Sequence, residues 1–407
     1  MKKKIIIITG VFLPEPIVSA RLMADLAGEL SKKYNVTVLR PHPSRPMGFN
    51  VPKYDLSDKP YNVVELDSYV CAKSSLIGRF RESISYGDAC LRYMEPLKSK
   101  LAFVYNGGWH LLGRKSIAEF CKKNHIPNIT PVQDIYPESL LSKLPKISFV
   151  QWMAKKLLMP FDMKTLHAAN KVHTISNGMR AYLAETRGVN IDRFVVVRNW
   201  QDEREFTIYQ ETHPIIEDHP FTFMYMGNVG ALAGLDVVID AFVKASLNGA
   251  RLVIAGSGSA KESLMSQAKK YPSYDIQFWE VPFGEVPATQ AKADVMVLPI
   301  KKGFAKSSIP SKLPAYMFSH KPVLASVDND SDTAKCIIDG NAGWVCEPED
   351  IDAIAITLQK AFLTDKTQIV EMGENGYQYG IRDFSRTINL EILANACTEV
   401  IEKQSKP

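Results

Sequence analysis

The sequence predicts an α/β protein of two domains, each built from a parallel β-sheet covered by helices. Three observations support this. The 407 residues exceed the usual size of a single hydrophobic core. Short apolar segments alternate with amphipathic ones along both halves of the chain, as they do in βα units. A polar, acidic stretch at 201–219 separates the halves and indicates a linker.

The first half begins with a βα unit. Residues 1–20 imitate a signal peptide, with three lysines before an apolar run, but Pro14 and Pro16 interrupt the segment and an amphipathic pattern follows. Amphipathic patterns predict helices at 19–33, 76–98 and 177–186, and five prolines predict a loop at 41–60. The first domain is expected to cover 1–202, with strands at 5–10, 35–40, 62–67, 101–106, 127–133, 171–176 and 193–200.

The second half repeats this alternation. Helices are predicted from 235 and at 260–270, 312–318 and 350–363, with the second domain covering 203–380. A last helix at 383–402 belongs to a C-terminal segment, 381–407, that is expected to pack back on the first domain. The predicted strands lie at 221–227, 251–258, 275–279, 294–298, 323–327 and 342–345.

The net charge of +5 conceals an asymmetry between the halves. Residues 1–200 hold 30 Lys and Arg against 16 Asp and Glu, or +14, and residues 201–407 hold 19 against 28, or −9. A basic half indicates an anionic partner. Because no nucleic-acid-binding motif is present, the sequence favours an anionic membrane surface over nucleic acid. No run reaches the ~18 apolar residues of a membrane span, so the contact is expected to be peripheral.

Residues 142–164 are the candidate for that contact. Their large apolar side chains are Phe149, Trp152, Met153, Leu157, Leu158 and Phe161, and their lysines are Lys143, Lys146, Lys155, Lys156 and Lys164. The pattern fits a helix that lies in a membrane interface. It fits equally well a helix packed on the protein core with its lysines facing solvent. The six cysteines form no CxxC and indicate reduced thiols in a cytoplasmic protein.

Glycines and lysines gather at predicted strand ends in the second half. Because the carboxyl ends of parallel strands share one edge, we expect them to form a seat for a nucleoside diphosphate, with Lys306 and Lys312 on the phosphates. The alternative to a phosphate-binding site is that the glycines only form tight turns and that the lysines of an ordinary βα crossover face solvent. The residues proposed to bind the nucleoside diphosphate are Gly227, Asn228, Gly230, Gly256, Ser257, Gly258, Val281, Pro310, Ser311 and Lys312.

Polar side chains also follow predicted strands in the first half. Asp134 and Glu138 come after 127–133, which places two carboxylates at a strand end where ligands bind. Glu15 and His110 are candidates for contact with a substrate, although the sequence fits equally well with a solvated loop charge at Glu15 and a packed loop histidine at His110. The acidic run at 328–332 lacks the glycine and final glutamate of a calcium loop, so no metal site is predicted.

The chain resembles the retaining GT-B glycosyltransferases of family 4 over nearly its whole length. The resemblance rests on segments such as VHTISNGMRAYLAETRGV, YMGNVGALAGLDVVIDAF, LVIAGSG, ADVMVLPI and NAGWVCEPED. Within that family, DIYPES, RNWQD and IPSKLPAYM are similar to the bacterial L-fucosamine (N-acetylfucosamine) transferase branch of surface-polysaccharide biosynthesis.

This resemblance implies two Rossmann-like domains facing across a cleft, with the donor bound mainly by the second and the acceptor by the first. It implies transfer, with retention and without a metal cofactor, of a 6-deoxyamino sugar from a UDP-sugar. The acceptor would be a lipid-linked (polyprenyl diphosphate) glycan of O-antigen or capsule biosynthesis, at the inner face of the plasma membrane. The catalytic residues would be Asp134, Glu138, Lys306 and Lys312, with the two carboxylates orienting acceptor or donor sugar hydroxyls. Glu15 and His110 would lie on the acceptor side.

The sequence departs from the family pattern at five positions. Ser307 and Ala315 stand where the family carries two glutamates, and Asn228 and Ala233 stand where an Arg and a Lys clamp the donor diphosphate. Gln133 replaces the histidine that often precedes Asp134. Two other functions therefore stay open: a sugar-nucleotide 2-epimerase of the same fold, and a catalytically degenerate subunit that only binds nucleotide sugar.

Overall fold

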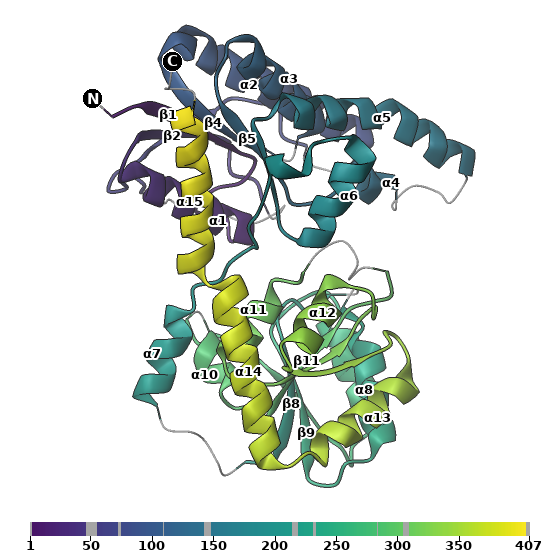
Figure 1. Ribbon diagram of the computed structural model, residues 1–407. Coiled ribbons are helices and arrows are strands. Elements are labelled where there is room, and N and C mark those ends of the chain that lie inside the picture. The colour runs from purple at the N-terminus through teal and green to yellow at the C-terminus, as the bar shows by residue number, and fades with distance from the viewer. Residues whose placement is uncertain are drawn as a thin grey trace. The chain divides into compact units, whose positions relative to one another are not determined.

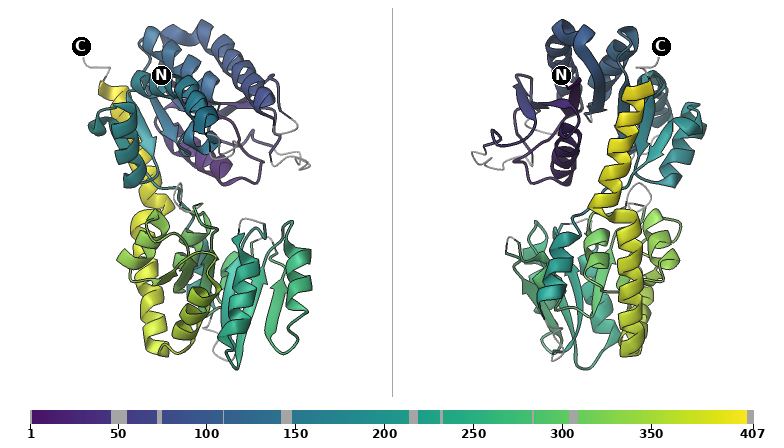
Figure 2. Two further views of the ribbon diagram at one scale, coloured as in Figure 1. Left: turned by 90° about the vertical axis from the view of Figure 1, so that its right-hand side faces the viewer. Right: turned by 60° about the vertical axis from the view of Figure 1, so that its left-hand side comes forward.

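The computed structural model describes residues 2–45, 55–71, 75–108, 110–141, 148–213, 219–230, 233–282, 284–303 and 309–403. The chain divides into two compact units, Met1–Asn199 with Asn389–Pro407, and Trp200–Ile388 (Figure 1). Each unit contains one parallel sheet with helices on both faces (Figure 2). The expected α/β architecture of two Rossmann-like domains is confirmed.

The first unit has a seven-stranded sheet in the order β3-β2-β1-β4-β5-β6-β7. The strand order reverses between β1 and β4, the topological switch point at which ligands bind in open α/β sheets. The strands are β1 (Lys4–Thr9), β2 (Asn35–Pro41), β3 (Asn62–Leu66), β4 (Leu101–Gly107), β5 (Asn128–Val132), β6 (Lys171–Thr174) and β7 (Phe194–Val196).

Helices cover both faces of this sheet, and for that reason β1 is a continuous run of isoleucines: Ile5 to Ile8 are all fully buried. Helices α2, α3 and α5 pack in sequence, α2 on α3 and α3 on α5. The helices are α1 (Val18–Ser31), α2 (Leu76–Met94), η1 (Glu95–Lys100), α3 (Leu111–Lys123), α4 (Glu138–Leu141), α5 (Ser148–Ala168), α6 (Asn177–Arg187), η2 (Ile191–Arg193) and α15 (Arg386–Lys403).

The second unit has a six-stranded sheet in the order β10-β9-β8-β11-β12-β13, which reverses between β8 and β11. Alternate residues of β8 enter two hydrophobic clusters: Met224 and Met226 belong to one, Phe223 and Tyr225 to the other. This strand is therefore apolar throughout. The strands are β8 (Phe221–Met226), β9 (Ala250–Ala255), β10 (Asp275–Trp279), β11 (Val295–Pro299), β12 (Val323–Ser326) and β13 (Gly343–Cys346).

The helices of the second unit correct the expected linker, because α7 (Arg204–Thr212) lies within it. Phe206 of α7 is buried in a hydrophobic cluster of this unit, which explains why a polar segment forms a helix here. The others are α8 (Leu235–Ala245), α9 (Lys261–Ala268), α10 (Val286–Gln290), α11 (Lys312–Phe318), α12 (Asp332–Asp339), α13 (Ile351–Phe362) and α14 (Lys366–Phe384).

The C-terminal helical region is two helices in place of the single one expected at 383–402, since α14 ends at Phe384 and α15 begins at Arg386. The carboxylate of Glu203 fixes this junction. It accepts hydrogen bonds from the Ser385 hydroxyl at 2.6 Å and from the Arg386 N–H at 2.8 Å. Further along α15, Leu393 and Cys397 are fully buried.

Candidate functional site

The switch point of the second sheet is held open by a tyrosine. The ladder between β8 and β11 pairs only Phe223 and Met224 of β8. At Met226, the next position whose backbone faces β11, the hydroxyl of the fully buried Tyr316 accepts from the N–H at 2.9 Å and donates to the C=O at 2.7 Å. A side chain of α11 thus replaces a strand partner, and β8 and β11 leave their ladder just before the turns that follow them.

Two glycine turns meet at the carboxyl ends of β8 and β9. A Cβ at Gly256 would lie 2.2 Å from the carbonyl oxygen of Gly227, closer than any real contact, and the φ of Gly256 is 128°. The Val229 N–H also donates to the Ser257 carbonyl at 2.8 Å. Only glycine permits this backbone approach, which is also what a phosphate-binding turn requires.

Lys312 lies over these turns. A Cβ at Gly227, whose φ is 148°, would fall 2.2 Å from Lys312 Cε, so the lysine stem covers the Cα of Gly227. The ammonium lies 5.5 Å from the centroid of the Tyr225 ring. The side chain is half-buried, and this burial lowers the pKa of Lys312 below its ordinary value.

The charge of Lys312 has no counter-ion within the part of the chain that the structure describes. A partly desolvated ammonium that lacks an acidic partner attracts an anion more strongly than a fully hydrated one. Since α11 has only seven residues and Ser311 makes no side-chain cap, the lysine contributes more to this attraction than the helix terminus.

Asn228 shares the turn with Lys312. Its carboxamide lies against both neighbouring glycines: a Cβ at Gly230 would be 3.1 Å from Asn228 Nδ2, and one at Gly258 would be 2.8 Å from Asn228 Oδ1. The side chain is exposed, and the hydroxyl of Tyr225 fixes its backbone by donating to the Asn228 carbonyl at 2.6 Å. At the position where the resemblance implies an arginine, this chain therefore presents an amide.

The remaining proposed donor residues lie around this edge. Val281, half-buried after β10, packs against the core, whereas Ser257 and Ser311 are exposed and Pro310 is half-buried. Asp328, from the acidic run after β12, is buried and accepts from the Gly303 N–H at 2.8 Å, which holds the loop after β11. Lys306 lies outside the described residues.

Glu15 is a loop-holding residue in the structure. It is buried, and both carboxylate oxygens are bound by backbone N–H groups: Phe12 donates to Oε2 at 3.0 Å, and Ser44 and Arg45 donate to Oε1 at 2.8 and 2.7 Å. These contacts tie the loop after β1 to the loop after β2. We therefore leave Glu15 out of the proposed acceptor site.

His110 packs inside the first unit. It is buried at the start of α3, and its ring centroid lies 4.8 Å from that of Tyr86. Burial, with the nearby charges of Arg79, Arg45 and Arg114, lowers the pKa of His110 to about 3. Its burial beside Tyr86 favours the packed-histidine alternative over a contact with the acceptor.

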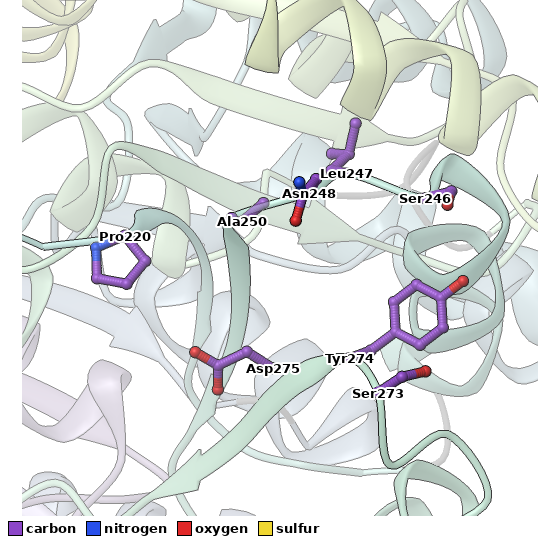
Figure 3. A pocket seen from close by; sticks show the side chains of 9 residues that line it. Pro220, Ser246, Leu247, Asn248, Ala250, Ser273, Tyr274 and Asp275 are labelled. Carbon is purple, nitrogen blue, oxygen red and sulfur yellow. The ribbon is translucent and has the colours of Figure 1, made fainter.

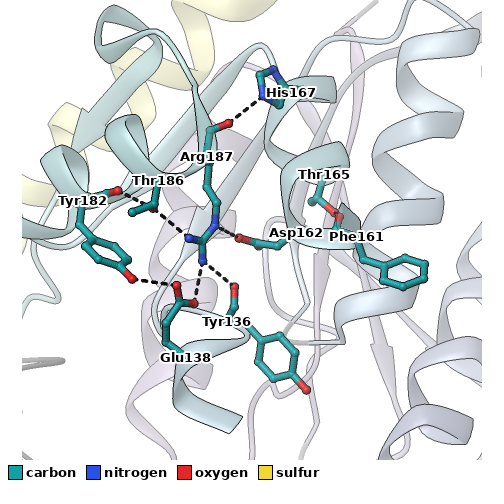
Figure 4. A network of polar contacts seen from close by, with 9 residues as sticks. All are labelled: Tyr136, Glu138, Phe161, Asp162, Thr165, His167, Tyr182, Thr186 and Arg187. Carbon is teal, nitrogen blue, oxygen red and sulfur yellow. Dashed lines mark hydrogen bonds and ion pairs between the residues drawn. The ribbon is translucent and has the colours of Figure 1, made fainter. Parts of the chain in front are cut away.

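Glu138 belongs to a buried ion-pair network (Figure 4). Arg187, at the end of α6, is fully buried and donates to Glu138 at 2.7 Å and to Asp162 of α5 at 2.9 Å. It also donates to the Tyr136 carbonyl at 3.0 Å, and the Tyr182 hydroxyl donates to Glu138 at 2.8 Å. These contacts anchor Glu138 at the start of α4 and favour a structural role over the catalytic one expected for it.

The two carboxylates of this network differ in burial. Burial raises the pKa of Glu138, but hydrogen bonds from Arg187, its own backbone N–H and Tyr182 outweigh it, so its pKa lies below the ordinary value. Asp162 is more deeply buried, and desolvation keeps its pKa raised despite Arg187. Asp134, in the loop between β5 and α4, is exposed and remains a proposed catalytic residue.

Sequence reasoning missed Tyr316 and Arg187. Both occur in amphipathic helical segments. In such a segment a tyrosine is normally interpreted as a core residue, and an arginine near a helix end as a solvated one. No sequence signal separates these alternatives, because the partners of both side chains lie on elements distant in the sequence: β8 for Tyr316, and α4 and α5 for Arg187.

A hollow of about 460 Å³ lies at the opposite edge of the second sheet. Pro220, Ala250 and Asp275, which line it, precede or begin β8, β9 and β10 (Figure 3). It is therefore separate from the glycine turns. Across the described ranges no cluster of three or more His, Cys, Asp or Glu side chains could hold a metal ion, and no helix is long and apolar enough to cross a bilayer.

Comparison with known proteins relates the chain to glycosyltransferases. Residues 220–363, in the second unit, match the family model described as "Glycosyl transferases group 1". The "Probable glycosyltransferase WbjE" of Pseudomonas aeruginosa is 26% identical over 284 residues, 68% of each chain. WcaI of Escherichia coli (strain K12), provisionally assigned as a colanic acid biosynthesis glycosyl transferase, is 25% identical over 233 residues, 53% of this chain and 55% of that protein.

A solved structure extends the likeness to the whole fold. Anabaena Alr3699/HepE in complex with UDP superimposes with a TM-score of 0.69 and 12% identity, and the match covers 97% of this chain and all of that one. Because it spans both units, it confirms the GT-B architecture of two Rossmann-like domains.

Proposed function

We propose that this protein is a glycosyltransferase that takes its sugar from a nucleoside diphosphate sugar, with UDP as the nucleotide. The second unit would bind the donor, with its diphosphate at the glycine turns after β8 and β9 and against Lys312. The match of residues 220–363 to the glycosyltransferase model and the UDP bound by a protein of like fold support this reading.

The observation that carries the proposal is the Lys312 ammonium lying over Gly227 at the β8/β11 switch point without a counter-ion among the described residues. As the bond to the sugar breaks, negative charge grows on the departing diphosphate. A fixed, partly desolvated cation stabilises that charge more than it stabilises the intact donor, and this difference lowers the barrier. Lys306 would add a second charge to the same anion.

Retention of configuration needs no nucleophile from the protein in this proposal. The acceptor hydroxyl attacks the anomeric carbon on the face from which the diphosphate leaves, and a diphosphate oxygen takes its proton. The C–O bond to the diphosphate breaks as the new glycosidic bond forms, so UDP departs with the proton. Asp134 would hold a sugar hydroxyl from the first unit. We keep Glu138 out of this step because Arg187 already binds it.

For the substrates, we propose a 6-deoxyamino sugar such as N-acetyl-L-fucosamine as the group transferred and a polyprenyl-diphosphate-linked glycan as the acceptor. The pathway would be surface-polysaccharide biosynthesis at an anionic membrane surface. The motifs DIYPES and IPSKLPAYM, together with the name of WcaI, support this choice.

The test is UDP release from a panel of UDP-sugars, with and without a polyprenyl diphosphate glycan. A transferase releases UDP with one donor, and fastest when the acceptor is present. A 2-epimerase would change the sugar without requiring an acceptor, and a degenerate binding subunit would bind UDP-sugar in calorimetry with no turnover. Either result would replace the transferase proposal.

We propose that transfer needs no divalent metal, because the diphosphate charge would be met by lysine and backbone N–H groups. Turnover measured with EDTA should equal turnover without it. Activity that disappears in EDTA and returns with magnesium or manganese would contradict this and redirect attention to Asp328, Asp330 and Asp332.

A further inference from the structure

The outward face of α5 is unusual for a helix at a protein surface. Four large apolar side chains are more than half exposed there: Phe149 (64%), Trp152 (57%), Met153 (51%) and Leu157 (66%). Trp152 and Met153 follow Phe149 by three and four residues, and Leu157 follows Met153 by four, so all four lie on one side of the helix. The opposite side carries Leu158, Asp162 and Leu166, which are buried in the first unit. We call the four exposed residues the α5 stripe.

The α5 stripe is bordered by positive charge. Lys155, Lys156 and Lys164 are exposed on the same helix, and Lys156 Nζ lies 5.0 Å from the centroid of the Trp152 ring. The only acidic residue of α5, Asp162, is buried against Arg187, so it does not offset these charges at the surface. The rings of Phe149 and Trp152 stack at 6.1 Å, which joins the apolar side chains into one patch.

We infer that the α5 stripe docks on an anionic lipid bilayer, with Trp152 and its neighbours among the headgroups and the lysines toward lipid phosphates. The first half of the chain carries +14, which complements such a surface. Amphipathic helices that lie in a membrane interface combine aromatic and aliphatic side chains with lysines in this way. The lysine stems can extend along the apolar side chains and place their ammonium groups at the phosphates.

A second copy of this chain fits the stripe less well. A two-fold interface would bring the lysines of one α5 close to those of the other, and like charges facing each other at a contact are unfavourable. A bilayer that contains anionic lipid removes this conflict. Figure 1 shows the N-terminal end of α5 extending past α2 and α3, in agreement with the exposure of the four stripe residues.

This inference deepens the proposed function, because a membrane-bound acceptor would be met at the same surface, but its test does not depend on catalysis. The full chain is mixed with vesicles of phosphatidylcholine alone or with added phosphatidylglycerol, and bound protein is measured by sedimentation at low and high salt. We expect binding to the anionic vesicles that weakens with salt, weak binding to neutral vesicles, and a blue shift of tryptophan emission that Trp152→Phe removes.

Two variants separate the contributions. Lys155→Glu with Lys156→Glu should lower the partition coefficient at least roughly tenfold at low salt, since each lysine near an anionic leaflet strengthens binding several-fold. Trp152→Ser with Leu157→Ser should weaken binding at every salt concentration. The matched control is Lys122→Glu with Lys123→Glu, the same charge change at exposed positions on α3, which should lose much less.

Several results would overturn the inference: no preference for anionic vesicles at low salt, an equal loss in the α3 control, or a concentration-dependent dimer that Trp152→Ser abolishes. Its failure is distinguishable from that of the proposed function. Donor turnover without vesicle binding would remove only the membrane contact, and vesicle binding without UDP-sugar binding would remove only the transferase.

Discussion

The stem of Lys312 lies across the Cα of Gly227, with Cε 2.2 Å from where a Cβ at that glycine would be. The relationship joins the first residue of α11 to the turn after β8, 85 positions earlier in the sequence. It brings a positive charge next to a glycine turn at the switch point of the second sheet.

Lys312→Ala should strongly slow transfer. The variant loses a contact to the diphosphate that strengthens in the transition state, a loss of ~2–4 kcal/mol or roughly 30- to 1000-fold in rate. Lys312→Arg should restore little, since a planar guanidinium differs in shape from an ammonium. The control is the exposed Lys335→Ala on α12. Steady-state UDP release decides, and a folded Lys312→Ala enzyme within threefold of the unchanged protein would refute the assignment.

Gly227→Ala and Gly256→Ala should fail in different ways. At Gly227 the new methyl meets the flexible Lys312 stem, so the lysine is displaced and UDP-sugar affinity falls, with a stability loss of about 1–3 kcal/mol from the strained φ. At Gly256 it meets the Gly227 carbonyl, which is backbone, so the unit itself should be destabilised more. Urea unfolding and calorimetric titration with UDP separate the two effects, and equal stability losses would contradict the difference.

Tyr316→Phe should destabilise the second unit. Removing the hydroxyl leaves the buried N–H and C=O of Met226 without the partner they share, which costs about 1–3 kcal/mol. The ring remains, so the core stays filled. Urea unfolding measures the change, and Tyr225→Phe, whose hydroxyl donates to a single carbonyl, provides the comparison. A loss no greater than that of Tyr225→Phe would argue against Tyr316 as the residue that holds the switch point.

Arg187→Leu should be among the most destabilising single changes in the first unit. It leaves Asp162 charged and buried without its partner, a loss of about 3–5 kcal/mol. Adding Asp162→Leu should recover part of it. Glu138→Gln, at the less buried end of the network, should cost less and leave donor turnover within a few fold, whereas Asp134→Asn should slow transfer. Greater slowing by Glu138→Gln than by Asp134→Asn would return Glu138 to the catalytic group.

The free energy of unfolding should fall as the solution is acidified from neutral pH, because two histidines are buried in their neutral form. Burial lowers the pKa of His110 to about 3 and that of His173 to about 4. Below the unfolded value near 6.5, the unfolded chain binds protons that the folded chain does not, so each pH unit costs about 1.4 kcal/mol per histidine until the folded pKa is reached. Urea midpoints at pH 7, 6 and 5 should decline less steeply in His173→Gln. An unchanged slope would exclude His173 as a cause.

The sequence by itself determined the order and type of most elements. Strands such as Ile5–Ile8 and Val295–Leu298 are apolar at every position because helices cover both faces of a parallel sheet. A short apolar run of this kind can be recognised from the sequence alone. The glycine turns after β8 and β9 could also be predicted from the sequence, because a turn at a strand end depends only on neighbouring residues. The helix α7 was missed because its burial depends on one residue, Phe206, and on a cluster far away in the sequence.

Only the tertiary structure decided which polar side chains are free to act. Glu15 is bound by backbone N–H groups about 30 residues away, and Glu138 by an arginine 49 residues away, so both are occupied. Lys312 forms no ion pair with an acid among the described residues, and for this reason it remains the proposed contact to the donor diphosphate. In the sequence these three residues look alike, as charged side chains near strand ends. Their difference arises from partners brought close by folding, and hydrogen bonding and desolvation act over a few ångströms in space whatever the separation along the chain.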